Sequence, residues 1–298
     1  GFGFLMVSYV VLGVGTGVFV VTAYATAANL APSGRQGRAM SNVSLGFSAS
    51  FVFGVPIGRV VTAAYDWKVI FWCIGFFTLL GIFAVARTIS STEGEASVPL
   101  GKQLVLLKKP TIAFALGVTF FVFISYSVVN TYITPFLTSV MSIRGGEVSV
   151  ILFALGIASL IGSKIGGFLS DRIGIARTLV GSMVIQALAL ALLSIVARTT
   201  IVAIPLLMLW AIAAWTFGPT QNYNLLSLAP EASGIVLSLN SSFVQLGFAA
   251  GAAIGGIAVG SLVLAICWIG AAAVAIAVLL VSVSFGLTHS FSKRAATK

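Results

Sequence analysis

Hydrophobic residues along this chain form long runs that are separated by short polar segments. A run of about 20 apolar residues is long enough to cross the hydrocarbon core of a bilayer as a helix. Nine such runs follow one another, and they predict nine membrane-spanning helices. The predicted helices cover residues 4–30, 44–65, 68–89, 111–138, 148–168, 178–197, 200–226, 236–258 and 262–287. The fold class expected from this pattern is an all-α membrane bundle.

The longest polar segment, residues 90–110, lies between the third and fourth predicted helices. We expect this segment to be a cytoplasmic linker between two bundles. Residues 1–89 would then form the last three helices of an N-terminal bundle, and residues 111–288 a C-terminal six-helix bundle. Residues 289–298 would form a cytoplasmic tail.

The composition excludes a water-soluble fold. Hydrophobic residues make up 59% of the chain and charged residues only 7%, whereas soluble domains contain about 25% charged residues. The net charge of +10 comes from basic residues scattered singly between apolar runs, which is unlike a nucleic-acid-binding surface. The predicted helices hold no converging His, Asp, Glu or Cys side chains, and no cysteine pattern has metal-ligand spacing. The sequence therefore predicts no cofactor, no metal site and no enzyme active site.

The basic residues also predict an orientation, because cytoplasmic loops of membrane proteins are rich in Lys and Arg. Of the 16 Lys and Arg residues, twelve fall on the side of the C-terminus and four on the other side. The twelve are Arg35, Arg38, Arg87, Lys102, Lys108, Lys109, Lys164, Arg172, Arg177, Lys293, Arg294 and Lys298. We therefore expect a multi-pass protein of a cell membrane, typically a bacterial inner membrane, with a cytoplasmic C-terminus.

Two short sequences recur in the same order near the two ends of the chain. Leu30-Ala31-Pro32 recurs as Leu228-Ala229-Pro230, 198 residues later, and Leu45-Gly46-Phe47 recurs as Leu246-Gly247-Phe248, 201 residues later. Six predicted helices separate the members of each pair, so an axis along the membrane normal should relate the two halves. Completing this symmetry would need three helices ahead of Gly1, which would make twelve in all.

Small residues at four-residue spacing form a stripe on the second and on the eighth predicted helix. Such a stripe lets two helix backbones approach closely. The stripes consist of Gly46, Ser50, Gly54 and Gly58, with Pro56 among them, and of Gly247, Gly251 and Gly255. Each stripe fits a static packing contact and equally fits a contact along which two bundles rock.

A glycine-rich and charged segment joins the fifth and sixth predicted helices. It reads Gly166-Gly167-Phe168-Leu169-Ser170-Asp171-Arg172-Ile173-Gly174 and is followed by Arg177. A carboxylate and a cation next to a helix end can hydrogen-bond to a neighbouring helix and hold a gate closed while they are desolvated. The alternative is a solvated loop that anchors the protein at the cytoplasmic face. The candidate gating residues are Gly167, Asp171, Arg172, Gly174 and Arg177.

This segment resembles the loop signature of the major facilitator superfamily. Gly54-Val55-Pro56-Ile57-Gly58 resembles the fifth-helix motif of antiporters in that family, and Arg35, Arg38 and the segment 66–71 also resemble it. The resemblance covers the whole chain as the fourth to twelfth family helices. It points to twelve-helix efflux permeases, such as arabinose-efflux-like proteins and drug–proton antiporters. It implies a monomeric exporter that works by alternating access and moves a small molecule.

One departure from the family pattern bears on proton coupling. Antiporters of the family often have an arginine on the fourth helix ahead of a glycine run, but here Tyr9 precedes Gly13, Gly15 and Gly17. The six acidic residues of the chain fall in predicted loops, although proton pumps usually carry an acid within the membrane. If protons are the coupling ion, we expect the acid in helices ahead of Gly1.

Polar residues deep in the predicted helices are candidates for binding a substrate, which is expected near the membrane midplane. They are Tyr126, Asn130 and Thr134 on the fourth helix, Trp215 and Gln221 on the seventh, and Gln245 on the eighth. Each of them could instead hydrogen-bond between helices. Tyr132 and Phe136 are expected to belong to an aromatic belt at the outer interface. An uncharged lining of aromatic rings and amides favours neutral or weakly polar compounds over phosphorylated ones.

These patterns favour a secondary transporter of a small organic solute. Two alternatives stay open at this point. The chain could be a transport-incompetent fragment or a membrane scaffold, because nine helices lack most of one half. It could also be a facilitator or an importer without proton coupling, because no acid lies within the predicted helices.

Overall fold

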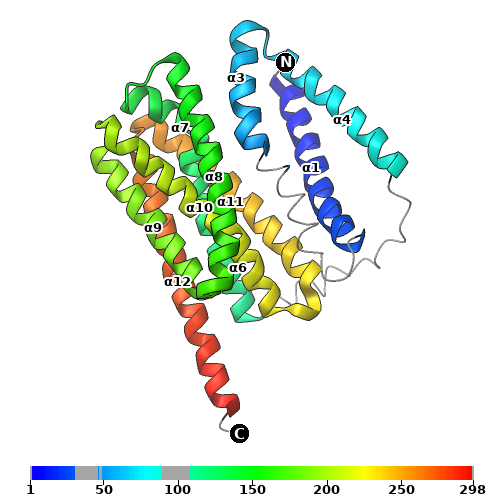
Figure 1. The fold of residues 1–298 in the computed structure, drawn as a ribbon, viewed down its shortest axis with the longest axis vertical. Helices are drawn as coiled ribbons and strands as arrows, with labels where there is room; N and C mark the ends of the chain where they lie inside the picture. The colour runs from blue at the N-terminus through cyan, green and yellow to red at the C-terminus, as the bar shows by residue number, and fades with distance from the viewer. Residues whose placement is uncertain (1, 31–45, 47–48, 89–107, 297–298) are drawn as a thin grey trace.

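The computed structural model describes residues 2–30, 46, 49–88 and 108–296, and these residues are helical over most of their length (Figure 1). The long helices are α1 (Phe2–Leu30), α4 (Lys68–Thr88), α6 (Pro110–Thr131), α8 (Gly145–Ile173), α9 (Ile175–Val196), α10 (Thr200–Leu228), α11 (Ser233–Ser261) and α12 (Ala265–Ala296). The short elements are the π-helices η1 (Ser50–Gly54) and η2 (Phe136–Val140), the helices α3 (Val55–Ala64) and α7 (Ile133–Pro135), and the 3₁₀-helix η3 (Pro230–Ala232). The expected all-α architecture is confirmed.

Eight of the described helices are long and apolar enough to cross a membrane. They correspond to eight of the nine predicted spans. The ninth, residues 44–65, is described from residue 49 onward as η1 followed by α3, and most of its first residues lie outside the described part of the chain. Pro56 lies in the first turn of α3, directly after the π-helix η1, and proline and π-turns are both common where a helix is irregular.

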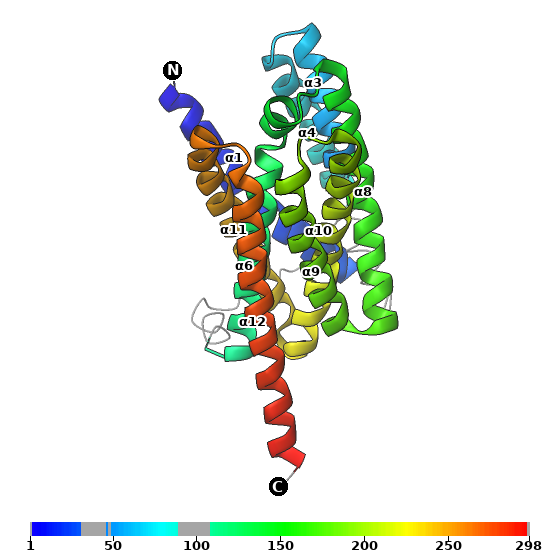
Figure 2. The same ribbon diagram turned by 90° about the vertical axis from the view of Figure 1, so that its left-hand side faces the viewer.

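The six long helices from α6 to α12 form one bundle (Figure 2). This bundle contains most of the buried side chains of the described residues. In this bundle α6 packs against α11 and α12, α10 packs against α8 and α9, and α9 also packs against α12. Large side chains such as Phe136, Trp210 and Phe217 are almost fully buried among these helices. Side chains of this size pack closely against one another, and this close packing restricts how the helices can interdigitate.

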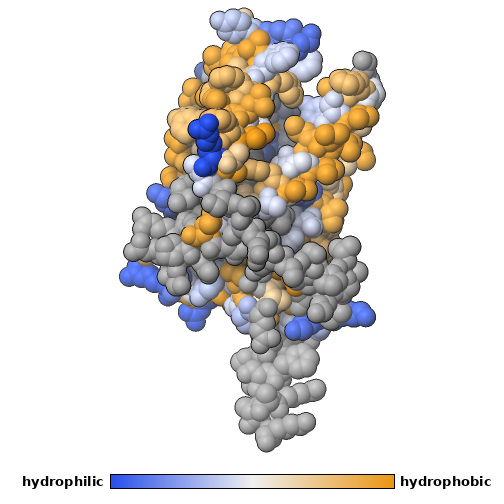
Figure 3. Space-filling view, turned by 90° about the vertical axis from the view of Figure 1, so that its right-hand side faces the viewer, coloured by the Kyte–Doolittle hydropathy of each residue, from blue (hydrophilic) through white to orange (hydrophobic). Residues whose placement is uncertain are grey.

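The N-terminal elements α1, α3 and α4 lie beside this bundle, as Figure 1 shows. They meet it mainly where η1 and α3 run along α8, and there the rings of Phe53 and Phe153 lie 6.2 Å apart. The described side chains of α1 and α4 are largely exposed. Figure 3 shows apolar side chains over much of the upper part of one face of the molecule. A helix that is apolar all round and exposed is expected to face lipid or other helices.

The fourth predicted span is not one straight helix. It is divided into α6, α7 and η2. The helix breaks at Tyr132, and Pro135 follows three residues later. Proline and π-turns are common causes of such breaks. Phe136 follows the break and is fully buried, so its expected place in an aromatic belt is wrong. Tyr132 is half-buried and donates a hydrogen bond to the carbonyl of Ala252 on α11 at 2.8 Å, so it too packs inside the protein.

Two helices extend beyond their predicted ends. The helix α8 continues to Ile173 instead of ending at 168, and α12 continues to Ala296, through residues that were expected to form a tail. Lys164 was counted among the basic residues of the cytoplasmic side, although the predicted span 148–168 contains it. In the structure it lies within α8 with two and a half helical turns still to follow.

Candidate functional site

Tyr126 on α6 is the centre of a group of aromatic side chains. Its ring stacks on that of Trp210 with centroids 5.5 Å apart and an angle of 15°. It meets the rings of Trp215 and Phe248 edge-on, at 5.9 and 5.8 Å. Tyr126 and Trp210 are buried, whereas Trp215 and Phe248 are partly exposed. We call these four residues the aromatic site.

Hydrogen bonds fix how this site is oriented. The indole Nε1 of Trp215 donates to the hydroxyl oxygen of Tyr126 at 3.1 Å, and the Tyr126 hydroxyl donates to Oδ1 of Asn130 at 3.3 Å. Asn130 is partly exposed, one helical turn beyond Tyr126. The structure thus brings together three of the predicted site residues, and the side chains of two of them, Trp215 and Asn130, are partly exposed. Both groups are uncharged.

A second polar group lies about two turns from the aromatic site, toward the start of α6 and the end of α10. The side chain of Gln221 donates to the carbonyl of Ala115 at 2.6 Å and to the hydroxyl of Thr119 at 3.0 Å. Thr119 donates to Asn240 on α11 at 2.8 Å. These bonds connect three helices, and Gln221 is only 1% exposed. In this structure Gln221 therefore has the alternative role, an interhelical hydrogen bond.

The same group includes two further asparagines. Asn240 donates to Oδ1 of Asn222 at 2.8 Å, and Asn224 donates to Oε1 of Gln221 at 3.3 Å. Asn222 is exposed, and the other members are buried. Between this polar group and the aromatic site, Phe123 contacts Phe217 and Phe248 with ring centroids 6.3 and 5.3 Å apart.

The other two predicted site residues lie apart from these groups. Gln245 is an exposed residue of α11, and among the described residues it takes no part in the hydrogen bonds of either group. Thr134 is partly exposed in α7, beyond the break at Tyr132. Their roles in binding stay predictions.

The glycine stripe of α11 lies against α6. A Cβ atom on Gly247 would lie 2.7 Å from the carbonyl oxygen of Phe120, and one on Gly251 would lie 2.6 Å from that of Ile124. A Cβ on Gly255 would lie 2.6 Å from the ring of Tyr132. Both helices belong to the C-terminal bundle, so this stripe is a packing contact within that bundle.

The stripe on η1 and α3 has fewer neighbours. A Cβ on Gly54 would meet nothing within 4 Å, and one on Gly58 would meet only the Ile70 side chain at 3.6 Å. A Cβ on Gly46 would likewise meet nothing within 4 Å. A contact along which bundles rock stays a prediction for this stripe, and Pro56 and Ser50 belong to the same prediction.

A second close contact, between α8 and α10, escaped the sequence analysis. A Cβ on Gly162 would collide with the carbonyl oxygen of Ile212, and one on Gly166 with that of Thr216. The hydroxyl of Thr216 donates to the Gly162 carbonyl at 3.1 Å. One turn on, Thr220 donates to the Gly166 carbonyl at 3.3 Å. The glycines therefore let α8 and α10 approach until hydroxyls of one helix bind carbonyls of the other.

The charged motif lies at the end of α8 and not in a loop. The helix includes Gly167, Asp171 and Arg172, and Gly174, with φ +90°, makes the turn into α9. Such a φ favours glycine. Asp171, Arg172 and Arg177 are exposed, and the Arg172 guanidinium lies 5.4 Å from the Phe168 ring centroid. A gating role for these residues stays a prediction.

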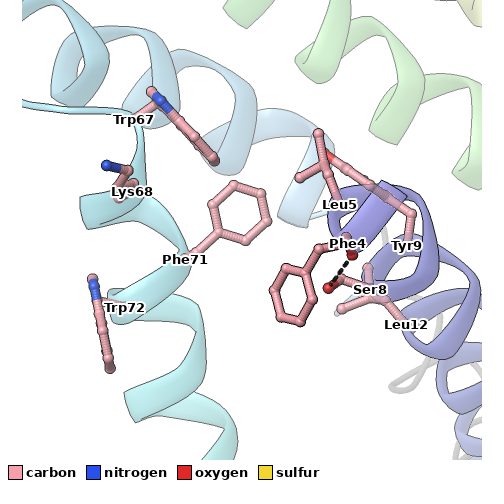
Figure 4. Close-up of a pocket in the computed structure, with 9 residues that line it drawn as sticks. All are labelled: Phe4, Leu5, Ser8, Tyr9, Leu12, Trp67, Lys68, Phe71 and Trp72. Atoms are coloured by element: carbon pink, nitrogen blue, oxygen red, sulfur yellow. Dashed lines mark hydrogen bonds between the residues drawn. The ribbon is translucent and has the colours of Figure 1, made fainter. Parts of the chain in front are cut away.

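A cavity of about 630 Å³ lies elsewhere, between α1 and the joint of α3 and α4 (Figure 4). Its lining is almost entirely apolar and consists of Phe4, Leu5, Ser8, Tyr9, Leu12, Trp67, Lys68, Phe71 and Trp72. None of the residues of the aromatic site or of the polar group belongs to it. Among the described residues, no cluster of His, Cys, Asp and Glu could hold a metal ion.

Comparisons with known proteins identify what this arrangement is similar to. The family model described as Major Facilitator Superfamily matches residues 1–252 and residues 115–297. The uncharacterized MFS-type transporter YbcL of Bacillus subtilis (strain 168) is 42% identical over 280 residues, which are 94% of this chain and 72% of that protein. A crystal structure of a bacterial homolog of the human lysosomal transporter Spinster, inward-facing and unoccupied, has a TM-score of 0.51 at 16% identity. That match covers 89% of this chain and 71% of the other, and it concerns the fold alone.

Proposed function

The chain belongs to the Major Facilitator Superfamily, whose members are membrane transporters and not enzymes, and from this premise we propose that it carries a small organic solute across the cell membrane by alternating access. The observation that supports a particular site is the partly exposed indole of Trp215, which Tyr126 holds in place at 3.1 Å beside the Asn130 amide. Substrates of such families bind near the midplane. Trp215 lies one residue from the middle of α10.

The side chains of this site favour a solute with a flat apolar part. The face of an indole ring can stack on an aromatic or other planar group, and the Asn130 amide can both donate and accept a hydrogen bond. No charged side chain belongs to the aromatic site or the polar group. We therefore propose a substrate whose planar part lies on Trp215 and Phe248, with a polar group next to Asn130.

We propose that the end of α8 acts as a gate at the cytoplasmic side. Asp171 and Arg172 are exposed in this structure, which is what an open gate would give, and the similar solved structure is inward-facing. A closed gate would desolvate the two side chains against a neighbouring helix, where charge-assisted hydrogen bonds are strongest. The acids Asp66, Glu147 and Asp171 lie at helix ends, so we propose no proton-carrying carboxylate among them.

The transport assay uses the protein in proteoliposomes and tritiated 1-naphthaleneacetamide, a planar neutral amide, as the probe. We expect saturable uptake above that of protein-free liposomes. We also expect Asp171→Asn to slow transport about tenfold without changing the affinity for the probe. A hydrogen bond to a charged group contributes about 1.5 kcal/mol, which corresponds to about a tenfold change in rate. The control, Glu147→Gln, removes an exposed acid at the opposite end of α8 and should leave the rate unchanged. Uptake equal to that of empty liposomes would contradict the proposed function.

We further propose that the natural direction is export and that the C-terminus is cytoplasmic. The support is the antiporter-like segment Gly54–Gly58 and the excess of basic residues on one side of the chain. A green fluorescent protein fused after Lys298 should fluoresce in bacterial cells, because this fusion partner folds in the cytoplasm and not after export through the general secretion pathway. A dark fusion at normal expression would reverse the orientation.

A further inference from the structure

We infer that Lys164 binds a carboxylate group of the transported solute, at the depth of the aromatic site. This inference rests on the proposed function and narrows its substrate class, because the neutral lining proposed above does not include Lys164. Three properties of Lys164 support this role: its depth in the membrane, the direction of its side chain, and the absence of a carboxylate partner among the described residues.

The contact between α8 and α10 gives the depth of Lys164. Gly162 lies against Ile212 and Gly166 against Thr216, so the two helices run side by side in register, and Lys164 is level with Ala214. Ala214 is the middle residue of α10, a helix of 29 residues. A helix of this length spans about 43 Å, more than the roughly 30 Å hydrocarbon core. Lys164 is therefore level with the middle of α10 and lies five residues past the middle of its own helix, α8.

The helical period gives the direction of the side chain. Lys164 lies two residues from both glycines that face α10, which places it on the opposite side of α8. Phe153 is eleven residues earlier, about three full turns, and so shares the face of Lys164. Its ring lies 6.2 Å from that of Phe53 on η1. Lys164 is therefore on the face of α8 that is turned toward the N-terminal elements.

Lys164 has no recorded carboxylate partner in the described part of the chain. Its side chain is exposed, and the ion pair recorded among the described residues joins Lys68 to Asp66 at 4.0 Å, between α3 and α4. The next acid on the same face, Asp171, is seven residues or about 10 Å away along α8. An ammonium at this depth is costly unless it has a counter-charge or water around it, so intramembrane lysines usually serve a substrate or an ion.

The chemistry of the lysine and of the aromatic site selects the kind of anion. One ammonium is a compact single charge, so it balances one carboxylate better than a doubly charged phosphate ester. Trp215, on the neighbouring helix α10, is one residue from the level of Lys164. A solute that extends from one to the other would carry its carboxylate at one end and an apolar, planar part at the other. The expected substrate class is an arylalkyl monocarboxylate.

The test compares two probes of nearly the same shape on the full chain in nanodiscs. They are tritiated 1-naphthaleneacetate, an anion, and tritiated 1-naphthaleneacetamide, its neutral counterpart. The wild type should bind the acetate about tenfold more tightly than the amide, as expected for one hydrogen bond to a charged group. Lys164→Gln should bind both equally, with unchanged affinity for the amide, and Lys164→Arg should keep most of the preference. Lys108→Gln, which removes an exposed lysine near the start of α6, is the matched control and should behave as the wild type does.

The outcomes separate this inference from the proposed function. Wild-type protein that binds the amide as tightly as the acetate would overturn the role of Lys164 and leave the aromatic site standing. The same holds if Lys164→Gln keeps the preference for the acetate while remaining monodisperse in size-exclusion chromatography. Wild-type protein that binds neither probe would overturn both the inference and the proposed site.

Discussion

Gly166→Leu is expected to prevent the C-terminal bundle from folding in a stable form. A Cβ at this position would collide with the carbonyl oxygen of Thr216, which is backbone and cannot move aside as a side chain could. Leucine would force α8 and α10 apart and break the bonds from Thr216 and Thr220 to the α8 carbonyls. Overpacking of this kind costs about 3 kcal/mol or more. Thermal unfolding of the purified protein in detergent measures the loss.

The neighbouring glycine supplies the control for this experiment. Gly167 lies on the same helix, but a Cβ there would meet nothing within 4 Å. Gly167→Leu should therefore unfold within a few degrees of the wild type, while Gly166→Leu should unfold far below it or elute as aggregate. Equal unfolding temperatures of the two variants would contradict the close approach of α8 to α10.

Trp215→Ala is expected to weaken binding of 1-naphthaleneacetamide about 30-fold. A planar group that stacks on the accessible indole face removes roughly 80 Å² of apolar surface from water, which is worth about 2 kcal/mol. Tyr126→Phe keeps both rings but removes the hydroxyl that accepts from Trp215 and donates to Asn130. It should weaken binding less, about fivefold, because one neutral hydrogen bond contributes about 1 kcal/mol. Equilibrium binding to the protein in nanodiscs measures both effects.

The control for this series is Trp268→Ala. Trp268 lies near the start of α12, is 55% exposed and lies outside both groups of the site. Its removal should leave the affinity for the probe unchanged. A Trp215→Ala variant that binds as well as Trp268→Ala does would place the substrate elsewhere in the molecule.

The membrane-spanning elements were predictable because a run of apolar residues has to be about 20 residues long to cross the bilayer. Tyr126 and Asn130 were predictable as neighbours because residues four apart share one helix face. The contact of Tyr126 with Trp215 was not predicted, because the sequence indicated only that both residues lie deep in their spans. Trp210 and Phe248 gave no signal of their own, because an aromatic residue in an apolar run looks the same whether it faces the core or a site.

Other parts of the site depend on which face of a helix meets which neighbour, and periodicity alone does not give that. Gln245 and Gln221 have the same side chain, but Gln221 is buried between helices and Gln245 is exposed. Gly162 and Gly166 did carry a signal, the four-residue spacing of small residues. It was overlooked because Gly166 was read as part of the segment that joins the fifth and sixth predicted helices, and Lys164 was counted with the cytoplasmic basic residues although the predicted span contains it.

The hydrogen bonds from Thr216 and Thr220 of α10 to the carbonyls of Gly162 and Gly166 of α8 restrict how these two helices can move. Two helices that are joined at several levels by backbone contacts and hydrogen bonds move as one rigid body. Neither helix can slide along the other without breaking all of these contacts. Trp215 and Lys164 both belong to this rigid pair of helices and lie at nearly the same level. The two groups would therefore move together relative to a bound solute. Release of the solute would depend on the N-terminal elements moving away from α8 and α10.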